Sequence, residues 1–196
     1  FNDAIINADK ALSLDKTLSD LFILKGQIYQ ENGEGEKAEE SYEEAYNAAK
    51  LNNEDPKKIK AFQAALFDIY YMNESYEKAI NINEQLIEND LENVALYSNA
   101  GALYQNMLLN EETYASEMFA TLKSLNQEDL QLLIFIYEDC ISYAKEARTK
   151  FIMCNQLEMD EDEAENYLKE AKQLKQRIND LNAQIKKVNK RIKEIE

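Results

Sequence analysis

Histidine and tryptophan are absent from the chain, and its 196 residues include only one proline, four glycines and two cysteines. Without histidine, the chain lacks the commonest general base and the commonest metal ligand of proteins. So little glycine and proline leaves few residues for the tight turns that join strands, whereas the strong helix formers Ala, Leu, Glu, Lys and Gln are abundant. The composition therefore predicts an all-α protein.

The two cysteines, Cys140 and Cys154, lie fourteen residues apart. If one helix carries both, this spacing separates them by about 21 Å, which is too far for a disulfide bond. With no histidine beside them, they offer neither a zinc site nor an activated nucleophile. We interpret them as small buried apolar residues.

The charge balance is strongly acidic, with 22 Lys and Arg against 38 Asp and Glu and a net charge of −16. Such a surface repels phosphate backbones and anionic lipid. No apolar run approaches the roughly 20 residues that cross a bilayer. We therefore expect neither a nucleic-acid partner nor insertion into a membrane. The sequence favours the cytoplasm, and an extracytoplasmic location, periplasmic or lipid-anchored through residues before Phe1, stays open.

A short segment returns along the first half of the chain, as Asn2-Asp3-Ala4, Glu36-Lys37-Ala38 and Glu77-Lys78-Ala79. The first two alanines are 34 residues apart and the next two are 41 apart. The seven additional residues make about two helical turns, so they preserve the face of the helix. A period of this length predicts an array of two-helix repeats.

The first complete unit has a bulky residue, a small residue and aromatic residues at regular spacing, namely Phe22, Gly26, Tyr29, Ala38 and Tyr42. This pattern resembles the tetratricopeptide repeat. The next unit keeps Leu66, Tyr70 and Ala79 but has Phe67 in place of the small residue, and Asp55-Pro56 predicts a helix that begins at Pro56. The third unit shows Tyr97, Gly101 and Tyr104, followed by Ala115 and Phe119 after a turn expected around Asn110.

The resemblance implies a right-handed superhelix of antiparallel helix pairs, an α-solenoid. We expect a repeat array over residues 1–127 and a capping helical region over 128–196. The array would comprise a half repeat and three repeats, at 1–17, about 18–55, 56–93 and 94–127. Because Phe1 falls in what the pattern predicts as the second helix of a repeat, we also expect residues upstream of it.

After Asn126 the spacing of apolar residues changes to alternate steps of three and four, which predicts a long helix over 128–157. Its seam is Leu130, Leu133, Tyr137, Cys140, Ala144, Ala147, Phe151 and Cys154. A second long helix over 161–196 follows an acidic start. Its seam is Ala164, Tyr167, Ala171, Leu174, Ile178, Leu181, Ile185, Val188, Ile192 and Ile195, a coiled-coil pattern.

Two arrangements satisfy this second seam. In a hairpin within the chain, Ala164, Tyr167 and Ala171 would meet Phe151, Ala147 and Ala144. In a parallel dimer, two copies of the last helix would pair, which leaves open a homodimer through the C-terminal helix. We favour a hairpin whose exposed end associates. The candidate self-association residues are Ile185, Val188, Ile192 and Ile195.

By the resemblance, the first helix of each unit lines a concave groove that binds a peptide or a helix. The corresponding groove residues are Asp20, Ile23, Gln27, Gln30, Ala64, Asp68, Tyr71, Met72, Ser98, Ala102, Gln105 and Asn106. The set is polar, mildly acidic and rich in amides, and it lacks the lysine and arginine of family members that grip a carboxylate terminus. A neutral or basic peptide or amphipathic helix is therefore the expected protein partner.

No catalytic, metal or cofactor site is predicted, and we do not expect an enzyme. Asp160 and Asp162 lack the glycine turn of a calcium loop, and Gly33 and Gly35 lack the lysine and hydroxyl of a phosphate loop. The resulting hypothesis is a non-enzymatic scaffold that binds proteins. The alternative is a sensor or regulatory module of a larger signalling or transcription-regulating protein, in which the coiled coil sets a dimer state.

Overall fold

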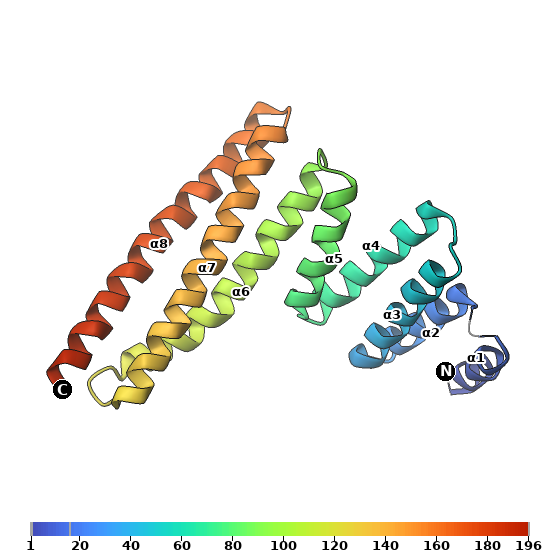
Figure 1. The fold of residues 1–196 in the computed structure, drawn as a ribbon, viewed down its shortest axis with the longest axis horizontal. Helices are drawn as coiled ribbons and strands as arrows, with labels where there is room; N and C mark the ends of the chain where they lie inside the picture. Colours follow the sequence, from blue (N-terminus) through green and yellow to red (C-terminus); the bar gives the residue numbers. More distant parts are fainter. Residues whose placement is uncertain (1, 16, 196) are drawn as a thin grey trace. The chain divides into compact units, whose positions relative to one another are not determined.

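The structure is a computed structural model that describes residues 2–15 and 17–195 (Figure 1). The described residues form helices joined by short turns, with no strand among them. The helices are α1 (Asn2–Leu14), α2 (Ser19–Glu31), α3 (Gly35–Leu51), α4 (Pro56–Met72), α5 (Tyr76–Asn89), α6 (Val94–Ala120), α7 (Gln127–Leu157) and α8 (Glu161–Ile195). The predicted all-α fold class is confirmed, as is the start of a helix at Pro56.

The chain divides into two compact units, Phe1–Asn89 and Asp90–Glu196. The first unit holds α1 to α5, and the second holds α6 to α8. The sequence placed the boundary after residue 127 instead, because it assigned residues 94–127 to the repeat array. In the structure α6 packs on α7, so it belongs with the two C-terminal helices.

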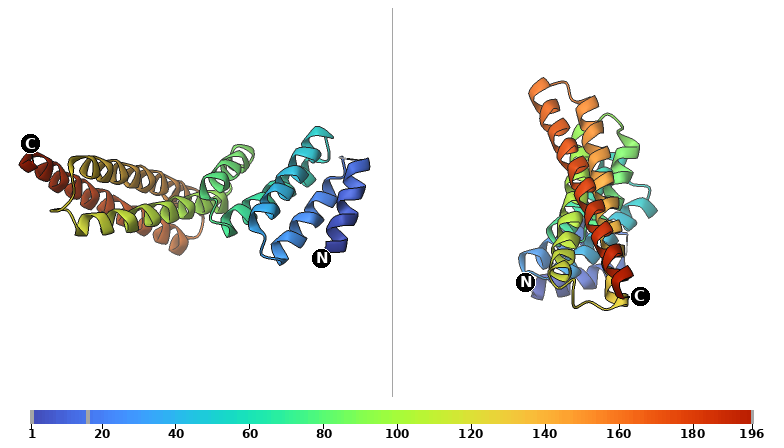
Figure 2. Two further views of the ribbon diagram at one scale, coloured as in Figure 1. Left: turned by 90° about the horizontal axis from the view of Figure 1, so that it is seen from below. Right: turned by 90° about the vertical axis from the view of Figure 1, so that its left-hand side faces the viewer.

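In the first unit each helix packs on the next one along the chain, from α1 to α5, and the left view of Figure 2 shows the same order. Small side chains on α3 permit this close stacking, since Ala38, Ala45 and Ala49 are fully buried. The turns after α2, α3 and α4 each contain one residue with positive φ, at Gly33, Asn53 and Glu74. The helix pairs are thus joined by turns of one repeated kind.

Gly26 is the point of closest approach between α2 and α3. A Cβ atom at this position would lie 2.8 Å from Cδ2 of Tyr42, closer than packed atoms approach one another. The ring of Tyr42 therefore occupies the space that any other residue would need. This contact joins the small residue and the aromatic residue that the repeat pattern singled out in the first complete unit.

In the second unit α7 packs against both α6 and α8. Phe151 of α7 contacts both neighbouring helices. A Cβ atom at Gly101 of α6 would lie 2.8 Å from Cζ of Phe151. The ring of Phe151 stacks on that of Tyr167 of α8, with centroids 6.2 Å apart. Asn155 closes the turn, because its Nδ2 donates to the carbonyl of Ala164 at 2.9 Å. The hairpin arrangement is the one that the structure contains.

The prediction of a turn around Asn110 is wrong. Helix α6 runs without interruption from Val94 to Ala120, and Asn110 lies on its exposed side. The neighbouring residues Leu108 and Ala115, seven apart on one helix face, are both buried, so the same face of α6 keeps its packing through this region. The sequence near Asn110 also has no glycine or proline that would end a helix.

The predicted long helices at 128–157 and 161–196 agree with α7 and α8 to within a residue, and Glu196 lies outside the described residues. Each helix starts with a side-chain cap. Asn126 accepts from the amide of Asp129 at 2.9 Å, and Asp160 accepts from the amide of Glu163 at 3.0 Å. The acidic residues before α8 therefore serve the helix start.

The self-association residues differ in where they lie. Val188 is fully buried within its own chain, and Ile185 and Ile192 are half-buried. Ile195 is 39% exposed. While the second unit is folded in this way, Val188 is not accessible to a second chain.

Replacing Gly26 by leucine should destabilise the first unit by about 1–3 kcal/mol, because the new side chain must displace the buried ring of Tyr42. Urea unfolding followed by circular dichroism measures this change. The matched control is Gln27→Leu, which adds the same side chain on the exposed side of α2 and should change stability by less than about 0.5 kcal/mol. Equal stability of the two variants would contradict the proposed role of Gly26.

Candidate functional site

Four of the predicted groove residues border one hollow of about 330 Å³ in the first unit. Gln30 comes from the end of α2, and Asp68, Tyr71 and Met72 come from the last turns of α4. The remaining walls are Tyr42, Ala65 and Ile69. We call this site the α2–α4 hollow.

Gln30 links the three helices around the α2–α4 hollow. Its Nε2 donates to Sδ of Met72 at 3.2 Å, and its Oε1 accepts from the hydroxyl of Tyr42 at 3.3 Å. Beside it, two large side chains remain open to solvent, Tyr71 at 45% and Met72 at 61% exposure. The ring of Tyr71 stacks on Phe67 with centroids 6.2 Å apart, which gives it a defined position at the surface.

Asp68 provides negative charge at the wall of the α2–α4 hollow. Although its side chain reaches solvent, partial desolvation by neighbouring atoms raises its pKa above the ordinary aspartate value. Burial raises the pKa of Tyr42 as well, and the charge of Asp68 adds to this effect. At neutral pH the hollow thus combines exposed apolar surface, one amide and one carboxylate.

The other predicted residues of α2 and α4 lie outside this hollow. Asp20 of α2 forms an ion pair with Lys58 of α4, in which Oδ2 and Nζ are 2.7 Å apart. Ile23 is half-buried, and Gln27 and Ala64 are exposed. These four residues therefore line the faces of α2 and α4 without contributing to the hollow.

The predicted residues Ser98, Ala102, Gln105 and Asn106 belong to α6 in the second unit and are half-buried there. Gln105 donates to Oε2 of Glu170 on α8 at 3.2 Å. It borders a different hollow between α6 and α8, which also contains the ion pair of Glu112 and Arg177. Of the four predicted residues of α6, Gln105 alone borders this hollow.

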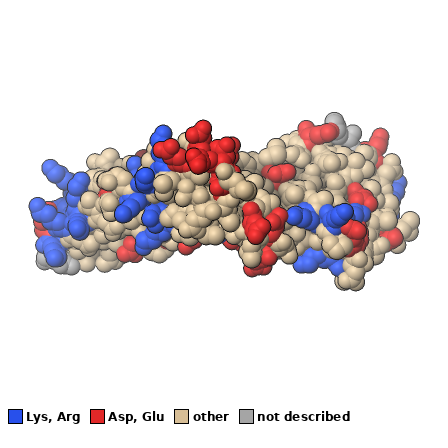
Figure 3. All heavy atoms as spheres, turned by 90° about the horizontal axis from the view of Figure 1, so that it is seen from above, with Lys and Arg blue, Asp and Glu red and all other residues tan. Residues whose placement is uncertain are grey.

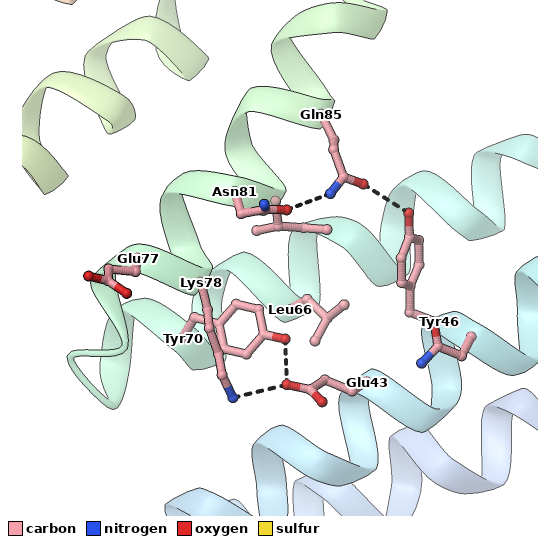
Figure 4. A pocket seen from close by; sticks show the side chains of 10 residues that line it. Glu43, Tyr46, Leu66, Tyr70, Glu77, Lys78, Asn81 and Gln85 are labelled. Atoms are coloured by element: carbon pink, nitrogen blue, oxygen red, sulfur yellow. Dashed lines mark hydrogen bonds and ion pairs between the residues drawn. The ribbon is translucent and has the colours of Figure 1, made fainter. Parts of the chain in front are cut away.

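A further hollow, of about 510 Å³, was missed by the sequence reasoning (Figure 4). It lies between α3 and α5 with α4 behind it, and we call it the α3–α5 hollow. Its lining residues are Glu43, Tyr46, Asn47, Leu66, Tyr70, Glu77, Lys78, Asn81, Ile82 and Gln85. The groove assignment by resemblance covered only the first helix of each repeat, so it excluded α3 and α5.

Ion pairs and hydrogen bonds fix one end of the α3–α5 hollow. The hydroxyl of Tyr70 donates to Oε1 of Glu43 at 2.7 Å, and Nζ of Lys78 lies 3.1 Å from the same oxygen. Lys78 also contacts Oε2 of Glu39 at 2.9 Å. Burial and the bond to Glu43 together raise the pKa of Tyr70, so its phenol stays protonated at neutral pH.

Glu39 is a buried carboxylate that ties α3 to the turn between α4 and α5. Its Oε1 accepts from Nδ2 of Asn73 at 2.9 Å and from Oγ of Ser75 at 2.7 Å. Burial acts to raise the pKa of Glu39, but the bonds from Ser75, Asn73 and Lys78 outweigh it and the pKa lies below its ordinary value. The ionised form is therefore stabilised by folding.

Charge in the second unit is divided along α8, which begins with Glu161, Asp162 and Glu163 and has a basic last turn. The acidic start and the basic end are visible as separate red and blue areas in Figure 3. Near the basic end, Nη2 of Arg191 donates to the carbonyl of Lys123 at 2.9 Å. This arginine thus helps to join α8 to the turn before α7.

The described residues contain no group of three or more Cys, Asp or Glu side chains arranged to hold a metal ion. Burial raises the pKa of Cys140 to about 12 and that of Cys154 to about 11, so both remain thiols at neutral pH. In the part of the chain that the structure describes, no helix combines the length and the apolar character of a membrane span.

These helices define the class of the chain: an all-α protein in which consecutive helices pack in pairs. No model of a known protein family matches it, and no curated protein matches its sequence. It is similar to a solved structure described as "Crystal structure of MamA", with 18% identity and a TM-score of 0.41 over 88% of this chain and 87% of that chain. A likeness this low supports no conclusion about function.

Replacing Glu39 by glutamine should lower stability at pH 7 by about 1–3 kcal/mol, because three donors lose a charged acceptor. Since folding lowers the pKa of Glu39, its contribution is complete above the unfolded pKa of about 4.3 and is lost as the pH falls through the lower folded value. The difference between wild type and variant should thus shrink below about pH 4. Urea unfolding across this range measures it, and a constant difference would contradict the charged role.

The two thiols should react slowly with a thiol reagent at pH 8 in the folded chain and rapidly after denaturation, because burial keeps them protonated. Absorbance after addition of an aromatic disulfide reagent follows the reaction. Fast reaction of either cysteine in the native chain would show that the interior of the second unit is open.

Proposed function

We propose that the chain is a non-enzymatic protein-interaction module whose α2–α4 hollow binds a short segment of a partner protein. The observation that carries this proposal is the placement of two exposed large side chains, Tyr71 and Met72, beside a concave surface with polar walls. Exposed apolar surface of this kind, rimmed by polar groups, is typical of interaction sites.

The residues of the α2–α4 hollow indicate the chemistry of the segment. Its volume of about 330 Å³ suits an apolar side chain, which would gain contact with Tyr71 and Met72. Gln30 can donate to or accept from a backbone amide group. Asp68 and the net charge of −16 favour a neutral or basic segment over an acidic one.

A regulatory module that works through a dimer of the last helix is the alternative from the sequence. That function would need the seam of α8 to contact a second chain. Because Val188 and Leu181 are buried within their own chain, the structure favours the single-chain scaffold.

The partner segment can be sought with a library of short random peptides displayed on phage and selected on the whole chain. Selected peptides should be neutral or basic and should contain at least one large apolar residue. Their affinities follow from fluorescence anisotropy with labelled peptides. Selection of acidic peptides only would contradict the proposed chemistry of the α2–α4 hollow.

Tyr71→Ala should weaken binding of a selected peptide by about tenfold or more, as expected for an aromatic residue central to an interface. The matched control is Tyr114→Ala, which removes a tyrosine of similar exposure, 51%, from the second unit. This control should bind as wild type does. Anisotropy titrations measure the affinities of both variants, and circular dichroism verifies unchanged helicity. Equal affinities of the two variants would show that the binding site lies elsewhere.

Asp68→Lys should weaken binding of a basic peptide by a similar factor, because it reverses the charge at the wall of the α2–α4 hollow. Glu40→Lys makes the same change in net charge at an exposed position of α3 that does not border this hollow. If both reversals weaken binding equally in anisotropy titrations, the effect belongs to the charge of the whole chain and not to the site.

A further inference from the structure

We propose that the α3–α5 hollow is a second binding site on the first unit and that it takes an arginine side chain of a partner protein. This inference rests on the proposed interaction function but not on the α2–α4 hollow. The two sites use opposite faces of α4: Leu66 and Tyr70 border one, whereas Asp68 and Met72 border the other. Successive helical positions are rotated by about 100°, which separates these pairs.

The floor of the α3–α5 hollow is apolar. Leu66 of α4 and Ile82 of α5 are both almost fully buried and lie at its base. Long basic side chains cover such surface with their methylene groups while the charged end reaches polar atoms. The floor thus suits the stem of a lysine or an arginine.

The carboxylate of Glu43 is held in place with one oxygen available. Its Oε1 takes the bond from Tyr70 and the contact with Lys78, as the dashed lines in Figure 4 show. Among the described residues, no donor contacts Oε2 of Glu43. A positioned carboxylate oxygen with no donor is suited to accept a charged N–H group.

The charges around the α3–α5 hollow favour a cation. Its lining includes the carboxylates of Glu43 and Glu77 and only one cation, Lys78. Lys78 is shared between Glu43 and the buried Glu39. Acidic groups therefore exceed basic groups here, in keeping with the net charge of −16, and an anionic ligand would be repelled.

A relay of amides at the other end of the α3–α5 hollow supplies further acceptors (Figure 4). The hydroxyl of Tyr46 accepts from Nε2 of Gln63 at 3.2 Å. The same hydroxyl donates to Oε1 of Gln85 at 3.3 Å. Nε2 of Gln85 donates to Oδ1 of Asn81 at 2.7 Å. These oxygens have a second lone pair each, and the amide group of Asn81 can donate to a backbone carbonyl.

The arrangement favours arginine over lysine. A guanidinium group is planar and offers five N–H donors in a fixed geometry that matches a carboxylate, so it can give more than one hydrogen bond to that of Glu43. Stacking adds no preference, because Nζ of Lys50 lies 5.0 Å from the centroid of the Tyr46 ring and Nζ of Lys78 lies 5.2 Å from that of Tyr70. An ammonium group has fewer donors and concentrates its charge at one point.

The test uses a peptide probe, acetyl-Gly-Ala-Arg-Ala-Gly-amide, with versions that contain lysine or the neutral isostere citrulline. Heteronuclear NMR of the whole chain reports binding through the side-chain amide signals of Asn47, Asn81 and Gln85, which lie in the site. The arginine peptide should give a saturable shift of these signals. The lysine peptide should bind about fivefold more weakly, and the citrulline peptide should give no saturable shift.

Glu43→Gln should weaken binding of the arginine peptide by about tenfold or more, because a charged acceptor is lost. The matched control, Glu44→Gln, makes the same change in net charge at the next, exposed residue of α3 and should retain wild-type affinity. Asn47→Lys provides a second test, since it adds a cation at the exposed rim without removing a partner of Tyr70 or Lys78. It should also weaken binding.

Three results would overturn the arginine site. One is the absence of a saturable shift with the arginine peptide, and another is an equal response to the citrulline peptide. The third is binding that Glu43→Gln and Asn47→Lys both leave unchanged. None of these results affects peptide binding that depends on Tyr71, so failure of this site is distinguishable from failure of the α2–α4 hollow.

Discussion

The close approach of helices at a glycine is the constraint on which both units depend. Gly26 gives the ring of Tyr42 its place between α2 and α3, and Gly101 does the same for Phe151 between α6 and α7. Because a Cβ atom would collide with each ring, the aromatic side chains hold the helices at one separation and in one register. The same type of contact thus organises a stack of helix pairs and a bundle of three long helices.

This packing determines which surfaces remain for partners. In the second unit, α8 buries its seam against α7, and the exposed face of α8 is mostly polar and charged. In the first unit, short helices meet at angles that leave hollows on two faces of α4. One hollow presents exposed Tyr71 and Met72, and the other presents a positioned carboxylate at Glu43. We place recognition in the first unit, where these two hollows lie.

The sequence predicted most helices because their signals are local: Pro56 after Asp55 starts α4, and the spacing of apolar residues defines α7 and α8. Contact between Phe151 and Tyr167 was also predictable, since a hairpin fixes which residues face each other. The prediction of a turn at Asn110 was wrong. Ala115 and Phe119 fit the second helix of a repeat in the sequence, but in the structure they continue α6. The α3–α5 hollow was not predictable, because its residues come from three helices and carry no shared motif.

We infer that the α2–α4 hollow of the first unit is a recognition surface. Hydrogen–deuterium exchange of the whole chain, with and without a peptide selected from the displayed library, tests it most directly. We expect slower exchange at residues 27–33 and 65–75, which flank the hollow, and unchanged exchange in α6 to α8. Protection confined to residues 94–195 would contradict it.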